Sequence, residues 1–176
     1  VGPVGEYAMT ALGRERMFEY FCHTLQIPTM ILRLNYAVEL RYGVLVDIAL
    51  QVQNEQPVDL SMGHVNVIWQ RDANAMALAA LADAEIGPYV VNCSGPEILS
   101  IREIAETFGR LLGKTPRFAG EEQPTALLNN GSLGYVRYGR PNVPPETIMK
   151  WVANWIGEGK PMLNKPTHFQ TRDGRF

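Results

Sequence analysis

The chain has 176 residues, 46% of them hydrophobic and 19% charged, with a formal net charge of −2 at pH 7. This length suits one domain, or one with a small appendage, and the apolar fraction excludes a disordered chain. Neither a basic excess nor a polybasic run suggests binding to nucleic acid or a membrane surface, and no apolar run approaches the roughly 20 residues of a membrane span. Because Cys22 and Cys93 are too few for a disulfide framework, we expect a reducing compartment, the cytoplasm.

The first third of the chain predicts a helix, a strand and a second helix. Residues 5–26 carry apolar side chains at helical spacing, and Pro28 ends the pattern. Residues 29–34 are a short and nearly continuous apolar run, which is typical of a strand buried on both faces of a parallel sheet. A loop is expected over residues 35–42, and an amphipathic helix follows over residues 44–52.

The remainder continues this alternation, which indicates the α/β class. Ser100 and Glu103 form an S-x-x-E capping box at the start of a helix that Gly113 ends, and Trp151 and Trp155 lie on the apolar face of the last helix, where we expect core positions. The other expected elements are strands at 64–69, 89–92 and 115–119, helices at 72–84 and 144–157, a turn-rich stretch at 129–140, and a polar tail at 160–176 with an Asp173-Gly174 turn.

Residues 7–15, Tyr-Ala-Met-Thr-Ala-Leu-Gly-Arg-Glu, resemble the active-site helix of the extended short-chain dehydrogenase/reductases. These are NAD(P)-dependent epimerases and dehydratases that mostly act on nucleotide sugars. Their pattern is Tyr, three residues, Lys, three residues and Glu, often with Ser or Thr just before the Lys. Tyr7, Thr10 and Glu15 match this pattern, and Ala11 stands at the position of the Lys.

Further segments resemble the same family in the same order, and together they cover nearly the whole chain. They are residues 30–36, 70–75, 89–95, 100–103 with 112–114, and 151–156. The resemblance implies the end of a Rossmann-type parallel sheet plus the small mixed α/β substrate-binding lobe of this family. It divides the chain into the last part of a dinucleotide-binding domain (1–42), mainly the substrate lobe with returning sheet elements (43–159) and a C-terminal tail (160–176).

The resemblance also implies site residues. Tyr7 would be the catalytic acid or base and would contact the cofactor, NAD or NADP. Asn35 and Tyr36 would border both cofactor and substrate, and Arg41 would line the sugar pocket. The chain departs from the family's Asn-x-Tyr-Gly-Pro, because Ala37 and Val38 follow Tyr36. His23, His64 and His168 have no mutual spacing that suggests a metal site, so none is assigned.

Two functions follow from the Tyr helix. The first is a sugar or nucleotide-sugar epimerase or dehydratase in which Tyr7 assists hydride transfer by moving a proton. In the family, the Lys ammonium lowers the pKa of the Tyr and holds the cofactor ribose, and Ala11 can do neither. The second function is therefore a non-catalytic family member that binds a ligand or a partner subunit.

The resemblance implies parts that these 176 residues do not contain. The family's Gly-rich phosphate-binding turn is absent. With the start at Val1 rather than Met, this suggests the C-terminal portion of a longer protein whose N-terminal Rossmann half lies upstream. Family members often dimerise through the Tyr helix, so a homodimer is expected. The stripe of Phe18, Phe21 and Cys22 fits either that interface or packing on the chain's own sheet.

Overall fold

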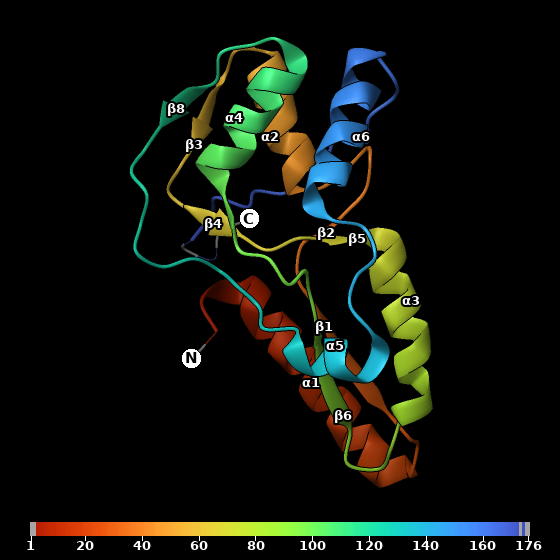
Figure 1. Ribbon diagram of the computed structural model, residues 1–176. Helices are drawn as coiled ribbons and strands as arrows, with labels where there is room; N and C mark the ends of the chain where they lie inside the picture. Colours follow the sequence, from red (N-terminus) through yellow and green to blue (C-terminus); the bar gives the residue numbers. More distant parts are fainter. Residues whose placement is uncertain (1–2, 173, 175–176) are drawn as a thin grey trace.

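The computed structural model describes residues 3–172 and 174, in which helices alternate with short strands and confirm the α/β class (Figure 1). The helices are α1 (Gly5–Leu25), α2 (Val44–Gln53), α3 (Gln70–Ala80), the short 3-10 helix η1 (Leu81–Asp83), α4 (Ile101–Leu112), α5 (Ser132–Tyr138) and α6 (Pro145–Gly157). The strands are β1 (Met30–Leu34), β2 (Ala37–Val38), β3 (Pro57–Asp59), β4 (His64–Val65), β5 (Ile68–Trp69), β6 (Tyr89–Cys93), β7 (Leu99–Ser100) and β8 (Arg117–Ala119).

The longest strand pair joins two segments that lie far apart in the sequence. β1 and β6 run parallel, with Met30 opposite Tyr89 and Leu34 opposite Cys93. The pairs β2–β5 and β3–β8 are also parallel, whereas β4–β7 is antiparallel. Among the described residues, β6 is the sole strand paired with β1, so the other edge of β1 is open.

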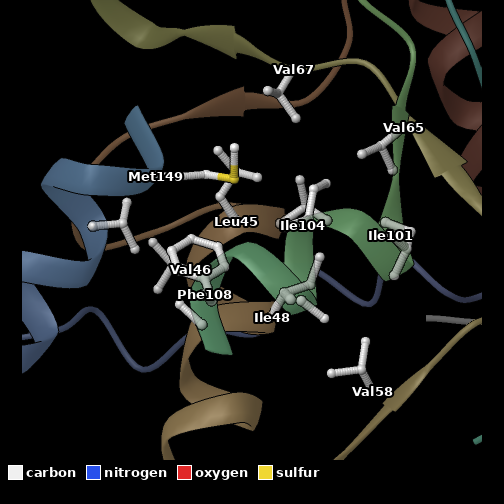
Figure 2. Close-up of a cluster of buried hydrophobic side chains, with 14 of the residues drawn as sticks. Leu45, Val46, Ile48, Val58, Val65, Val67, Ile101, Ile104, Phe108 and Met149 are labelled. Carbon is white, nitrogen blue, oxygen red and sulfur yellow. The ribbon is translucent and has the colours of Figure 1, made fainter. Parts of the chain in front are cut away.

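The main core lies between α2, α4 and α6 in the upper part of Figure 1, with β3 and β4 beside it. Figure 2 shows Leu45 and Ile48 of α2 meeting Ile104 and Phe108 of α4, with Met149 of α6 closing one side. All these side chains are buried, because each helix turns its apolar stripe toward the other two.

The N-cap position predicted for Ser100 at the start of α4 is confirmed. The hydroxyl oxygen of Ser100 accepts a hydrogen bond from the backbone N–H of Glu103 at 3.3 Å. Gly113 follows the helix at φ 66°, a left-handed conformation that suits a residue without a Cβ atom. Both ends of α4 are therefore set by local sequence.

Three predictions of local structure are wrong. The expected loop at 35–42 contains β2, and the expected strand at 64–69 is broken between β4 and β5. The stretch 129–140, expected to be turn-rich, contains α5. Its Gly and Asn residues are used for packing: a Cβ atom on Gly134 would lie 2.9 Å from the carbonyl oxygen of Asn92, and the Asn130 side chain accepts from the Ser132 N–H at 3.0 Å. Tertiary contacts override local propensity here.

The two tryptophans of α6 are less buried than predicted. Trp151 is 41% exposed, and its ring meets that of Trp69 edge-to-face at 5.5 Å. Trp155 donates from its indole nitrogen to the carbonyl of Pro161 at 3.1 Å. The expectation of core positions is wrong for Trp151, because the buried side of α6 is formed by Ile148, Met149, Val152 and Ala153 with Pro145.

The tail is more than the polar extension that its composition predicts. Phe169 is buried in the main core, and Thr167 donates from both its backbone N–H and its hydroxyl to the Asp47 carboxylate at 2.7 Å. These contacts hold the tail against the first turn of α2. Asp173 of the expected Asp173-Gly174 turn lies outside the described residues.

An ion pair fastens α5 to η1. The Arg137 guanidinium donates to both carboxylate oxygens of Asp83, and the Tyr138 hydroxyl donates to the same carboxylate at 2.5 Å. The bond from Arg137, followed by that from Tyr138, lowers the pKa of Asp83 to about 2. The carboxylate is therefore more readily ionised in the folded chain than in an unfolded one.

We expect Asp83→Asn to lower the free energy of unfolding at pH 7 and to have a smaller effect at pH 3. Because folding lowers the pKa of Asp83, its stabilising contribution is present above the unfolded value near 3.8 and is lost as the pH falls toward 2. Urea unfolding at both pH values tests this, with the exposed Glu106→Gln as control. A decrease of the same size at pH 7 and pH 3 would contradict it.

Candidate functional site

The parallel pairing of β1 and β6 brings their carboxyl ends to the same edge. Asn35 and Tyr36 follow β1 there, and Ser94 and Gly95 follow β6. In open α/β sheets, ligands bind in the crevice outside the carboxyl ends of the strands. The structure therefore brings Asn35 and Tyr36, both predicted as site residues, to the edge where a ligand is expected.

A buried carboxamide joins these strand ends. Asn66, which lies just after β4 and is 3% exposed, accepts from the Asn35 side-chain amide at 2.9 Å. It donates to the carbonyl of Asn129 at 2.6 Å and to the hydroxyl of Ser94 at 3.1 Å. Sequence reasoning missed Asn66, Ser94 and Asn129. One local signal was present, since an Asn in the middle of a predicted strand is unfavourable unless its side chain has partners.

Tyr36 has an unusual backbone conformation for its residue type. Its φ is 42°, in the left-handed region that non-glycine residues rarely adopt, and such conformations occur often at functional sites. Its carbonyl accepts the N–H of Ile68 at 3.2 Å, so the turn is tied to β5. Burial raises the pKa of the Tyr36 phenol, which is therefore neutral at pH 7 and able to donate a hydrogen bond.

Tyr7 lies in the first turn of α1, where its side chain is 65% exposed. The hydroxyl of Thr10 donates to the carbonyl of Tyr7 at 2.7 Å, so the residue matching the family's Ser or Thr bonds to the helix backbone. Ala11 follows one turn after Tyr7 and brings no charge to it. This turn of α1 presents the phenol without the ammonium group that the family pattern places beside it.

Arg41 lies apart from the Asn66 network. Its guanidinium pairs with the Glu39 carboxylate at 3.1 Å, and its carbonyl accepts the N–H of Leu163 from the tail. The structure thus places Arg41 where the loop after β2 meets the tail, whereas Asn35 and Tyr36 lie at the carboxyl end of β1.

Glu15 and Arg33 hold α1 beside β1. The Arg33 guanidinium donates to both carboxylate oxygens of Glu15, at 2.9 and 2.6 Å, and this pairing lowers the pKa of Glu15. The partner of Glu15 therefore comes from β1 and not from the neighbouring arginines of α1. Further along the helix, Cys22 is buried, and its thiol donates to the carbonyl of Glu85 at 3.5 Å.

An open apolar groove separates the rest of α1 from β1. It has a volume of about 540 Å³, and its apolar lining includes Phe18, Phe21, Ile27, Met30 and Leu32. Phe18, Phe21 and Leu25 of α1 are exposed, so the apolar stripe of this helix is not covered by the described part of the chain. The groove lies along the open edge of β1 and is distinct from the polar carboxyl end.

The described residues contain neither a cluster of metal-ligating side chains nor a helix suited to a membrane. No three His, Cys, Asp or Glu side chains gather in a way that could hold a metal ion. None of the helices in residues 3–172 has the length and apolar character needed to cross a membrane.

We expect Gly95→Ala to lower the free energy of unfolding by about 1–3 kcal/mol, because the added Cβ atom would lie 1.9 Å from the carbonyl oxygen of Val67 and force the chain apart. The matched control is Gly13→Ala in the middle of α1, where no atom apart from the adjacent residues and the helix's own backbone lies within 4 Å of the added Cβ atom. This change should raise the free energy of unfolding by about 0.5–1 kcal/mol. Urea unfolding followed by circular dichroism measures both, and a Gly95→Ala variant as stable as the parent would contradict the close packing.

Solved structures that share this arrangement include several epimerases. UDP-glucuronic acid 4-epimerase from Bacillus cereus, solved with NAD, superposes with a TM-score of 0.74 at 20% identity, over 88% of this chain and 53% of that one. An epimerase from Methanothermobacter thermautotrophicus gives 0.72 at 17% identity, over 87% and 50%. UDP-glucose 4-epimerase from Thermus thermophilus, solved with NAD, gives 0.68 at 17% identity, over 84% and 52%.

No protein-family model matches the sequence, and no curated protein matches it. The chain spans about half the length of the solved structures that it resembles. At these identities the likeness concerns the fold, and it confirms the expected resemblance to NAD-dependent epimerases at the level of architecture. The chain therefore has an α/β fold that matches about half of each of these solved epimerases.

Proposed function

We propose that the chain is the substrate-side portion of an NAD(P)-dependent epimerase or dehydratase that acts on a sugar or nucleotide sugar. The observation that carries this proposal is the superposition on UDP-glucuronic acid 4-epimerase at a TM-score of 0.74, together with polar residues at the carboxyl ends of β1 and β6. Asn35 and Tyr36 would border the sugar and the nicotinamide there, and Arg41 would contact the substrate from the loop after β2.

The residues present fit the sugar side of such a site better than the cofactor's pyrophosphate side. The Asn35 carboxamide and the neutral Tyr36 phenol suit hydroxyl groups, whereas the sequence has no Gly-rich turn for a pyrophosphate. NAD or NADP, when bound, would accept and return a hydride. The role of this chain would be to orient the sugar and, through the Tyr7 hydroxyl, to take or give the proton of the reacting oxygen.

The second candidate function is a non-catalytic module that binds a ligand or a partner subunit. Ala11 favours it, since it stands where the family pattern places the Lys. The hydroxyl of Thr10 is also engaged with the Tyr7 carbonyl. The two candidates share the fold and the ligand edge and differ only in whether a proton moves.

The open edge of β1 supports a further part of the proposal, an N-terminal Rossmann half that completes the sheet. A strand of that half would pair with β1 on the side away from β6, and its apolar residues would fill the groove beside Phe18 and Met30. Burying this groove is favourable at about 25 cal/mol per Å² of apolar surface. The half-length match to the solved epimerases is consistent with such a partner.

A homodimer and a cytoplasmic location complete the proposal. Met9, Met17 and Tyr20 lie on the side of α1 opposite Cys22, given 100° per helical residue, and all three are exposed. This second stripe, away from the groove, is the surface we assign to a dimer. Both cysteines are free thiols, which suits a reducing compartment.

Tyr7→Phe tests the catalytic role in the protein that carries both halves, with conversion of the nucleotide sugar to product, followed by chromatography, as the readout. We expect it to lower turnover of a nucleotide sugar about 100-fold, because the proton-transferring hydroxyl is lost, and Ala11→Lys to raise turnover by a factor of at least about 10. Unchanged turnover in Tyr7→Phe would remove Tyr7 from the mechanism. No turnover in the parent or in Ala11→Lys, with NAD still bound, would favour the non-catalytic module.

A matched pair on α1 tests the two apolar surfaces. We expect Phe18→Asp to prevent association with the N-terminal half, because it places a carboxylate in the groove, and to leave the dimer intact. Met9→Asp, on the side of α1 opposite Phe18 at 100° per residue, should break the dimer and leave the groove functional. Light scattering, with and without the separately expressed N-terminal half, measures both. A monomeric parent would end the dimer proposal, and normal association of Phe18→Asp would end the groove proposal.

A further inference from the structure

We propose that Asn66 is a positioning residue, which holds the Asn35 carboxamide with its oxygen facing outward at the carboxyl end of β1. Asn35 would then offer a ligand a hydrogen-bond acceptor, so the ligand group that meets it must be a donor, such as a hydroxyl or a ring N–H. The inference rests on the proposed function for the identity of the ligand, but the orientation of Asn35 is a property of the chain itself.

Backbone groups fix the orientation of the Asn66 side chain. A backbone N–H is always a donor and a backbone carbonyl is always an acceptor, whereas a carboxamide can exchange its donor and acceptor by rotating. Its Nδ2 donates to two carbonyls, those of Asn129 at 2.6 Å and Gly95 at 3.2 Å. Its Oδ1 accepts the backbone N–H of Asn129 at 3.3 Å. Reversing the Asn66 carboxamide would place its oxygen against carbonyl oxygens and its NH₂ group against an N–H. Because the side chain is buried, water could not satisfy these groups.

Asn66 in turn fixes Asn35. The Asn66 Oδ1 faces the Asn35 Nδ2 at 2.9 Å, so Asn35 must present its amide nitrogen inward. Its backbone is held as well, since its N–H donates to the carbonyl of Cys93 at 2.9 Å. Among the residues that the structure describes, no protein donor reaches the Asn35 Oδ1. The oxygen left at the ligand edge is therefore an acceptor whose direction the protein has set.

The same network places the segment that faces this edge. The Asn129 side chain donates to the carbonyl of Arg33 on β1 at 3.2 Å, and the Tyr135 hydroxyl donates to the carbonyl of Ser94 at 2.7 Å. Asn66 thus connects the ends of β1 and β6 with the segment leading into α5. Ser94 is fully buried and cannot touch a ligand, so it provides a control that disturbs the network without disturbing the Asn35–Asn66 bond.

The first experiment needs no ligand. In the ¹⁵N-labelled chain we expect the side-chain NH₂ of Asn35 to exchange with water more slowly than that of Asn74, which is exposed on α3. Asn66→Ala should abolish this difference, and Ser94→Ala should preserve it. Exchange of Asn35 as fast as Asn74 in the parent chain would overturn the proposal, even if Asn66→Ala fails to fold.

The second experiment is a double-mutant cycle with UDP-glucose as the probe, by calorimetry. We expect Asn35→Ala and Asn66→Ala each to weaken binding by about three- to tenfold, the range of one neutral hydrogen bond. Asn66→Ala should add nothing in the Asn35→Ala background, because it acts through Asn35. Additive losses would overturn the positioning role. A parent that binds no UDP-glucose but shows slow Asn35 exchange would contradict the proposed function and leave the orientation of Asn35 established.

Discussion

The parallel pairing of β1 and β6 is the constraint on which the rest of this structure depends. Parallel neighbours cannot be joined by a tight turn, so the chain must leave the end of β1 and return to the start of β6 by a long crossover. That crossover contains α2, α3 and the strands between them. Since both strands then end at one edge, Asn35 and Ser94 become neighbours although they are far apart in sequence. A polar edge able to meet a ligand is a consequence of the topology.

The cost of such an edge is that polar groups are brought together inside the protein, where each needs a partner. An unsatisfied buried carboxamide or carbonyl costs about 1–3 kcal/mol. Asn66 meets this need for several groups, because its amide and oxygen both bond to the backbone of Asn129 and its remaining capacity goes to Ser94 and Asn35. Gly95 allows the approach, since any Cβ atom there would collide with Val67. Close packing and hydrogen-bond satisfaction therefore depend on each other at this edge.

The sequence could predict the features that depend on neighbouring residues, but not those that depend on tertiary contacts. The helix from Ser100 to Gly113 was predictable because its cap, its apolar stripe and its terminating glycine are all local. Asn35 and Tyr36 were found by the resemblance of their segment to a family. Asn66 and α5 were missed, because the partners that justify an asparagine in a strand, or a helix in a Gly- and Asn-rich stretch, lie 28 or more residues away. The burial of Trp151 was predicted wrongly, because an apolar stripe shows which side of a helix faces the core but not how deeply each residue is buried.

The two candidate functions differ in what they require of helix α1. It presents Tyr7 at one end and lines the open groove along its length, yet Cys22 is its one buried residue in the described chain. A helix with so few buried contacts draws little stability from its own core, and its position depends on what covers its apolar side. The placement of Tyr7 would then be decided less by α1 itself than by whatever fills the groove beside Phe18. Ala11 and the open groove therefore raise separate questions. The first concerns the chemistry available one turn after Tyr7, and the second concerns what holds the Tyr7 side chain in place.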